Sequence, residues 1–368
     1  QALYEELQQV DGVIIRAVSD MGWMVYRMAK QMGKPVAMEM AACAWDSTWN
    51  HGSPYRKIYA PMRYIRDKII TRNADYVLYV SHEFLPNRYP TNAITTFASN
   101  VRVERPRIEI LDRKIGKIKS LYQNKEGVVV IGLIGTLANK LKGVQDALEA
   151  IALSEKQCRK KIEFRILGPG PVEPFKALEK QRGITSKVRY DGLLKSGEEV
   201  MKWIDDIDIY IQPSYQEGLP RATIEAMSRA CPVIGSTAGG IPELIANPWL
   251  HRPGDASGLA GLIVEMVNDP FKQLANAKSN FENTAKYSAD LLMPKRIEFW
   301  KSYAAFIIEK RNREIAKANK APFFRLPNPY PVTPRWFAQL AVIPSLVMAG
   351  RAKRFPVAAL AARLRPGR

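Results

Sequence analysis

The sequence predicts an α/β protein with two Rossmann-like, doubly wound parallel-sheet domains that face a cleft, the first of them incomplete. Short apolar runs of strand length alternate with stretches of helical periodicity along most of the chain, which is typical of α/β proteins. The 368 residues suffice for two domains, and a hydrophobic content of 46% supports two sizeable cores. Short turns between strands and helices favour parallel sheets whose ligands bind beyond the carboxyl ends of the strands.

The first half has fewer elements than a complete domain of this class. Residues 2–9 are typical of a helix end that leads into a strand. We expect strands at 13–17, 35–40 and 76–80 and helices at 22–32 and 55–72. A doubly wound domain normally opens with a strand and a glycine-rich turn, and neither is found here. We therefore expect the first βαβ segment of this domain to be missing.

The second half shows the alternation more clearly. We expect strands at 128–134, 162–167, 188–190, 207–211 and 233–234. Helices should cover 143–153, 173–182 and 198–204, one should follow Pro220, and one should begin at Pro242. Residues 103–127 are charged and poor in long apolar stretches, which predicts the connection between the two domains.

The expected organisation therefore has four parts. Residues 1–110 form the first domain, and residues 111–290 form the second. Residues 291–310 form a separate last helix. Residues 311–368 form a basic, proline-rich tail.

Two glutamates flank a strand-to-helix turn in the run Glu217-Gly218-Leu219-Pro220-Arg221 to Glu225, which Gly239-Gly240 follows. Glu217 should lie in the loop and Glu225 about one and a half turns into the helix, so both could accept bonds from hydroxyls of one ligand at the helix start. Backbone donors at Gly218 and Leu219 would face the same ligand. A glutamate near a helix start is also favoured by the helix dipole alone.

A second glycine turn precedes a pair of lysines, Lys140 and Lys142. The turn contains Gly135 and Thr136 and follows the expected strand at 128–134. Backbone N–H groups and an ammonium group at such a turn favour a diphosphate and would balance its charge as it leaves. The alternative is a solvated lysine pair at a helix start.

Together these runs resemble the donor site of retaining glycosyltransferases of the GT-B fold, family 4, also called group 1. The resemblance covers about residues 10–310 and is nearest to bacterial exopolysaccharide and capsule glycosyltransferases. It implies that residues 1–110 form the acceptor-side domain, that residues 111–290 bind the nucleotide-sugar, and that the helix at 291–310 returns to the first domain. It implies that Lys142 holds the donor diphosphate, that Gly168 lies in a turn beside the nucleotide, and that Gly239 and Gly240 approach the ligand closely. The family's arginine position is Thr136 here, so Lys140 or Arg221 would have to supply the second positive charge.

The first half carries an aromatic and polar stretch at 39–52 that we expect to be a strand-end loop lining the cleft. The family places a histidine, and sometimes an acidic group, near the transferred sugar in this region. The resemblance therefore implies a role for His51 or Asp46, although the spacing differs. A His51 that only caps or packs is the alternative.

We expect neither a metal nor a cofactor besides the donor, a UDP- or GDP-sugar. Asp206 and Asp208 lack an oxygen-rich loop of the kind that a divalent ion requires. Three distant cysteines, Cys43, Cys158 and Cys231, predict reduced thiols in a cytoplasmic protein. The sequence contains no run of eighteen or more apolar residues, so we expect no membrane-spanning helix.

Positive charge is concentrated at the carboxyl end. From Arg311 to Arg368 there are twelve lysines or arginines and one acidic residue, which contributes +11 to a net charge of +19. This tail is expected either to lie on the inner face of an anionic membrane or to be a disordered soluble extension. The helix at 55–72 adds a second basic surface, with Arg56, Tyr59, Arg63 and Arg66 on one side and an apolar stripe of Ile58, Met62, Ile65 and Ile69 on another.

The resemblance thus implies a retaining, metal-independent hexosyltransferase that acts on a lipid-linked or polysaccharide acceptor, and the basic tail favours a peripheral position on the membrane. One alternative is a nucleotide-sugar epimerase of the same fold, against which the run from Glu217 to Glu225 argues. Another is a basic nucleic-acid-binding protein, suggested by a pI of about 9.8. No nucleic-acid motif supports it, and we expect no nucleic-acid partner.

Overall fold

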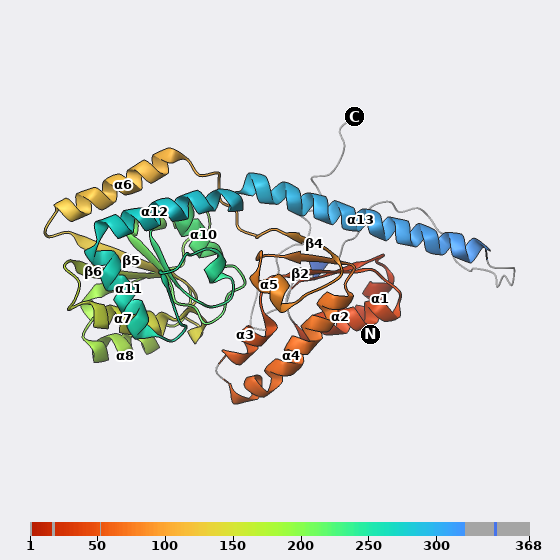
Figure 1. Cartoon of the computed structure of the whole chain (residues 1–368). Coiled ribbons are helices and arrows are strands. Elements are labelled where there is room, and N and C mark those ends of the chain that lie inside the picture. The colour runs from red at the N-terminus through yellow and green to blue at the C-terminus, as the bar shows by residue number, and fades with distance from the viewer. Residues whose placement is uncertain (1, 17–18, 52, 321–341, 344–368) are drawn as a thin grey trace.

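The computed structural model describes residues 2–16, 19–51, 53–320 and 342–343. It contains two parallel sheets, each covered by helices, and they lie side by side along the chain (Figure 1). None of the helices among these residues combines the length and the apolar character needed to cross a membrane.

The first sheet has the strand order β11-β1-β2-β3-β4. Its strands are β1 (Val13–Arg16), β2 (Val36–Met40), β3 (Tyr76–Tyr79), β4 (Ile94–Phe97) and β11 (Val342–Ile343). The helices of this half are α1 (Ala2–Gln8), α2 (Asp20–Gln31), α3 (Ala44–Trp49), α4 (Pro54–Asn73) and α5 (Phe84–Arg88). All neighbouring strands are parallel, as the alternating pattern predicted.

The stretch at 39–52 is not the loop that we expected. Glu39 lies within β2, and Ala44–Trp49 forms α3. The Tyr89 hydroxyl accepts a hydrogen bond of 2.9 Å from the backbone N–H of Ala44, so a side chain distant in sequence satisfies an amide at the start of this helix. The residues of the stretch itself therefore give no sign of this contact.

The second sheet has the order β10-β9-β8-β5-β6-β7 and is also fully parallel. Its strands are β5 (Val128–Ile134), β6 (Lys161–Leu167), β7 (Val188–Gly192), β8 (Ile209–Gln212), β9 (Val233–Ser236) and β10 (Leu250–His251). Its main helices are α7 (Val144–Ser154), α8 (Glu173–Arg182), α9 (Glu198–Asp206), α10 (Arg221–Ser228), α11 (Ala256–Asn268) and α12 (Pro270–Thr284). The 3-10 turns are η1 (Lys140–Lys142), η2 (Thr185–Lys187), η3 (Ile241–Glu243) and η4 (Ala285–Tyr287).

The prediction of a helix that begins at Pro242 is wrong. Only the turn η3 forms there, and the chain enters β10 at Leu250, which pairs with Gly235 of β9. Pro248 lies between η3 and β10 and has no N–H to continue a helical hydrogen-bond pattern.

Residues 103–127 are not mainly a connection either, because α6 (Ile108–Gln123) occupies most of them. Leu111 packs with Ala230 and Phe281 of the second half. The Lys114 ammonium is buried and donates to the Ile207 carbonyl at 2.7 Å. Figure 1 shows α6 beside α12 on the second half. An apolar residue every three or four positions from Ile108 to Ile118 is the helical signal that the charged composition masked.

The last long helix, α13 (Ala289–Lys320), continues ten residues beyond the end that we expected at 310. It runs along the first sheet (Figure 1), where Phe299, Tyr303 and Ile307 pack against the side chains of Ile14, Ala37, Tyr76 and Leu78. Arg296 pairs with Glu39 at 2.8 Å. The helix therefore braces the first half, while the exact domain boundaries stay predictions.

Candidate functional site

The strand order places two loops of the second half at one point. Strands β5 and β8 are neighbours in the sheet, whereas the chain reaches β6 and β7 on one side of β5 before it returns to β8 on the other. Such a reversal of strand order opens a crevice at the carboxyl ends of the two strands. The turn with Gly135 follows β5, and the loop with Glu217 follows β8.

Glu217 lies at the centre of a buried polar network in this crevice. Its Oε1 accepts hydrogen bonds from Lys142 Nζ at 2.5 Å, Ser214 Oγ at 2.8 Å and Gln212 Nε2 at 3.1 Å. Gln212 in turn accepts from the Tyr210 hydroxyl at 2.6 Å. In the described part of the chain no donor reaches Glu217 Oε2, which leaves this oxygen for an added ligand.

Lys142 reaches Glu217 because its own turn is packed closely. A Cβ at Gly135 would lie 2.8 Å from Lys142 Cγ, a distance that real contacts avoid, so glycine makes room for the lysine side chain. A Cβ at Gly168 would lie 1.9 Å from the Gly135 carbonyl oxygen. The two strand-end turns therefore pack backbone against backbone beside the lysine.

Glu225 lies on α10, whose amino end faces the same loop, with Pro220 as the capping residue. Burial raises the pKa of the Glu225 carboxyl, and the charge of Arg221 opposes this. No hydrogen-bond donor reaches the carboxylate within the described residues. Glu225 is half-buried, and a carboxylate that loses part of its water without gaining donors is destabilised unless a ligand provides them.

The paired glycines close the crevice from the next loop. Gly239 has a φ of +57°, and a Cβ there would lie 1.9 Å from the Glu217 carbonyl oxygen. The Gly240 N–H donates to the Gly218 carbonyl at 3.1 Å. The two loops are thereby held together, and the position of the Glu217 backbone depends on glycine at 239.

The first half contacts the loops of this site. A Cβ at Gly218 would lie 1.9 Å from the Ala41 carbonyl oxygen, so the two halves touch through backbone. Asn50 Nδ2 donates to the Tyr215 carbonyl at 3.0 Å. The Glu243 carboxylate accepts from the backbone N–H groups of His82 and Phe84 at 2.7 and 2.6 Å, at the start of α5.

Comparison with known proteins identifies the family. The family described as Glycosyl transferases group 1 matches residues 128–269, the part that contains this crevice. Protein CapJ of Staphylococcus aureus is 30% identical over 310 residues, which cover 83% of this chain and 75% of CapJ. The chain belongs to the group 1 glycosyl transferases.

Other relatives match a smaller part of this glycosyltransferase. The amylovoran biosynthesis glycosyltransferase AmsK of Erwinia amylovora is 34% identical over 137 residues, and the match covers 34% of this chain and 33% of AmsK. Among solved structures, HepE of Anabaena in complex with UDP-glucose has a TM-score of 0.60 at 18% identity, with 82% of each chain covered. Sucrose-phosphate synthase of Thermosynechococcus elongatus has a TM-score of 0.61 at 17% identity, covering 77% of this chain and 72% of that one. The shared fold is GT-B, with two parallel-sheet halves.

Several predicted site residues of the glycosyltransferase stand apart from the network. His51 is exposed, with its pKa lowered by partial burial and by the nearby charge of Arg56. Asp46 pairs with Arg88 at 3.3 Å, and burial raises its pKa. Lys140 and Arg221 are exposed.

Thr136 lies in the same turn as Gly135, but among the described residues its side chain forms no hydrogen bond with the network around Glu217. Its hydroxyl donates to the Pro169 carbonyl at 3.2 Å and accepts from the backbone N–H of Ala138. It therefore holds the turn between β5 and η1, which is a different task from that of an arginine.

Sequence reasoning missed Gln212 and Ser214 in the network, Asn50 between the halves, and the interdomain role of Glu243. A signal was present for Gln212, because a polar residue that ends an apolar strand is unusual. The other contacts join residues more than a hundred positions apart or depend on loop geometry, so no local pattern indicated them.

The two aspartates that suggested a metal are engaged elsewhere. Asp208 Oδ1 pairs with Lys117 at 2.8 Å, and its Oδ2 accepts from the Val130 N–H at 2.8 Å. Asp206 ends α9 and lies 3.8 Å from Arg165. Among the residues that the structure describes, no cluster of three or more histidine, cysteine, aspartate or glutamate side chains is arranged to hold a metal ion.

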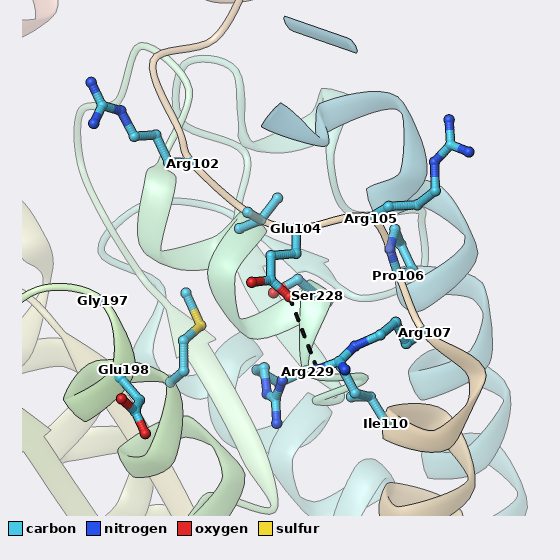
Figure 2. A pocket seen from close by; sticks show the side chains of 12 residues that line it. Arg102, Glu104, Arg105, Pro106, Arg107, Ile110, Gly197, Glu198, Ser228 and Arg229 are labelled. Carbon is cyan, nitrogen blue, oxygen red and sulfur yellow. Dashed lines mark ion pairs between the residues drawn. The ribbon is translucent and has the colours of Figure 1, made fainter. Parts of the chain in front are cut away.

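A pocket of about 420 Å³ lies elsewhere on the glycosyltransferase (Figure 2). Its lining includes Arg102, Glu104 and Arg107, which precede α6, and Ser228 and Arg229 at the end of α10. Arg229 also binds Asp205 through two hydrogen bonds of 2.7 and 2.6 Å. Because Glu217 precedes the amino end of α10, this pocket lies at the other end of the helix and is separate from the crevice.

Proposed function

We propose that this glycosyltransferase transfers a hexose from a nucleotide-sugar to a lipid-linked or polysaccharide acceptor, with retention of anomeric configuration, in the synthesis of a cell-surface glycan. The names of AmsK and of the colanic acid glycosyltransferase WcaL support the acceptor class. HepE, which was solved with UDP-glucose, supports a UDP-sugar as donor, and a GDP-sugar is the second candidate.

The observation that carries this proposal is the contact between Lys142 and Glu217 at the reversal of strand order. The lysine side chain is 28% exposed and the glutamate side chain 10% exposed, so the ammonium can meet an arriving ligand. A diphosphate would draw the ammonium towards itself and stabilise the charge that develops as the sugar leaves. Glu217 Oε2 and the Glu225 carboxylate would accept bonds from ligand hydroxyls.

The proposed step exchanges one bond at the anomeric carbon and transfers one proton. The bond between the anomeric carbon and the diphosphate oxygen breaks, and its electron pair stays on the phosphate. The acceptor hydroxyl oxygen bonds to the same carbon on the same face, and its proton passes to the departing phosphate. In this scheme the enzyme supplies no general base, which agrees with the position of His51 outside the network.

We also propose that the enzyme is cytoplasmic and peripheral on the inner face of the membrane, where a lipid-linked acceptor would be found. Of the basic tail that first suggested this, residues 311–320 belong to α13 and Val342 and Ile343 to β11, and the other residues lie outside the part that the structure describes. The membrane surface is therefore argued below from residues that the structure does describe.

The test compares Glu217→Ala and Lys142→Met with Glu173→Ala, an exposed glutamate at the start of α8. Transfer from UDP- and GDP-sugars and binding of the free nucleoside are measured for each variant. We expect the first two variants to lower transfer by roughly ten- to a hundredfold. Lys142→Met should impair transfer more than nucleoside binding, because its proposed partner is the departing diphosphate.

The outcomes separate the alternatives. Unchanged donor kinetics in folded Glu217→Ala and Lys142→Met would remove the central claim. Conversion of the donor sugar without any acceptor would favour the epimerase alternative.

A further inference from the structure

Helix α4 turns its apolar side away from the protein. Ile58 is 81% exposed, Ile65 56%, Met62 41% and Ile69 38%, and Tyr55 one turn earlier is 73% exposed. These residues recur at spacings of three and four, so they form one continuous stripe along the helix. An exposed stripe of large apolar side chains is unusual on a helix of a soluble domain.

The opposite side of α4 faces the first sheet. Its buried residues are Ala60, Asp67, Ile70 and Thr71, and Ile70 belongs to the main core. On a helix of 3.6 residues per turn these positions lie about half a turn from the stripe. Figure 1 shows α4 on the side of the first half that lies away from α13, so no described element covers the stripe.

Basic residues border the stripe on both sides. Arg56, Arg63 and Arg66 follow one edge, where Arg66 pairs with Asp20 of α2 at 3.0 Å, and Lys57, Lys68 and Arg72 follow the other. The only acidic residue of α4 is Asp67, which is buried. Aromatic rings lie near the start of the helix, where Lys57 is positioned over Trp49 at 5.7 Å from the ring centroid.

We propose that α4 lies in the headgroup layer of an anionic lipid membrane, with its apolar stripe inserted and its basic borders on lipid phosphates. A helix with an apolar face, flanking lysines and arginines and low net hydrophobicity is suited to this position. Charge complementarity favours lipid over a second copy of the chain, since two copies would bring their basic borders together.

The placement of α4 connects this surface with the crevice. Helix α3 packs on α4, and Asn50 at the end of α3 donates to the Tyr215 carbonyl of the crevice loop. A membrane at α4 would thus lie beside the face of the first half that contacts the donor-binding half. The proposal rests on the proposed function for the lipid-linked acceptor, but lipid binding itself does not require that acceptor.

The experiment measures cosedimentation of the full chain with vesicles of phosphatidylcholine alone and of an equimolar mixture with phosphatidylglycerol. The apolar variant is Ile58→Ser with Ile65→Ser. Its matched control is Phe271→Ser, an apolar side chain 80% exposed on the second half. The charge variant is Arg56→Gln with Arg72→Gln, matched by Lys176→Gln with Lys180→Gln on the exposed side of α8.

We expect the apolar variant to bind mixed vesicles roughly tenfold or more weakly at low and high salt. The charge variant should lose roughly tenfold at low salt and less at high salt, because salt screens the charges. Both controls should bind as the parent does. Transfer to a soluble acceptor should be unchanged in all four, so failure of the glycosyltransferase proposal would be seen separately in the parent enzyme.

Two results would overturn the proposal. If removal of residues 321–368 abolishes vesicle binding while both α4 variants bind normally, the tail is the anchor. If the parent forms a dimer without vesicles and Ile58→Ser with Ile65→Ser dissociates it, a second copy covers the stripe.

Discussion

Helix α10 buries its apolar side chains, whereas helix α4 leaves its apolar stripe exposed. In α10, five of eight residues are buried, among them Ile224 and Met227, and Glu225 is left without a hydrogen-bond donor. In α4, four of twenty residues are buried, including Asp67 and Thr71, while its isoleucines at 58, 65 and 69 face outwards. Apolar spacing therefore identifies a stripe on a helix, but it does not tell which way the stripe faces.

The largest expected difference between the helices is in stability. Ile224→Ala removes a fully buried side chain of α10 and should lower the free energy of unfolding by about 2–5 kcal/mol. Ile58→Ala removes an exposed one and should change it by less than about 0.5 kcal/mol. Chemical denaturation of both variants provides the measurement. A loss for Ile58→Ala as large as that for Ile224→Ala would mean that the stripe of α4 is packed in solution.

The buried acid of α4 should make stability depend on pH. Burial raises the pKa of Asp67 from 3.8 to about 7, and the charge of Arg63 opposes this. No donor reaches Asp67 Oδ2 in the described part of the chain. Because the folded state holds this proton more tightly than the unfolded state, the contribution of Asp67 is greatest below about pH 4 and is lost as pH rises to about 7.

Asp67→Asn should remove this dependence. Relative to the parent protein, the variant should gain on the order of 2–4 kcal/mol in unfolding free energy between pH 4 and pH 8. Asp112→Asn, at an exposed position of α6, is the control and should follow the parent. Parallel pH profiles for Asp67→Asn and the parent would show that the carboxyl is ionised without cost.

In α10 the corresponding acid is expected to serve the ligand. Glu225→Ala should weaken donor use by roughly ten- to a hundredfold, because it removes acceptors for ligand hydroxyls. Glu282→Ala, at an exposed position of α12, should leave donor use unchanged. Since burial raises the pKa of Glu225, donor binding should strengthen as pH rises through that pKa. Donor kinetics of both variants across pH test this, and equal kinetics would exclude Glu225 from the site.

The smallest expected effect is that of a metal chelator. Both oxygens of Asp208 are engaged by Lys117 and Val130, so we expect transfer to continue at nearly the same rate in the presence of chelator. Loss of activity with chelator and its recovery with manganese would make Asp206 and Asp208 candidate metal ligands again.

Much of the fold could be predicted because its strands are nearly continuous apolar runs. Strand β5 begins and ends where the sequence indicated, and β2, β3 and β6 differ by one residue at an end. Buried parallel strands require apolar side chains on both faces, so their signal is local. The prediction missed β4, β10 and the helices α3, α5, α6, α11 and α12. Of these helices α3 and α5 are short, and the Tyr89 hydroxyl and the Glu243 carboxylate satisfy amides at their starts.

The candidate site could be predicted in part for a related reason. The glycines at 218 and 239 could be identified because the close approach of backbone permits no other residue there, and glycine at 135 makes room for the Lys142 side chain. The sequence could not indicate that Lys142 would bond to Glu217, 75 positions away. Gln212 and Ser214 join that network only because β8 lies next to β5.

By itself, the sequence determined the two-part α/β architecture, the resemblance to group 1 glycosyltransferases and the glycine turns, since each depends on side-chain size and polarity at short range. The tertiary structure alone decided which charges meet, which half supplies Glu243 and which side of α4 faces outwards. These properties follow from the order of strands and the docking of the two halves. They arise from contacts between residues that are distant in the chain and therefore leave no local pattern.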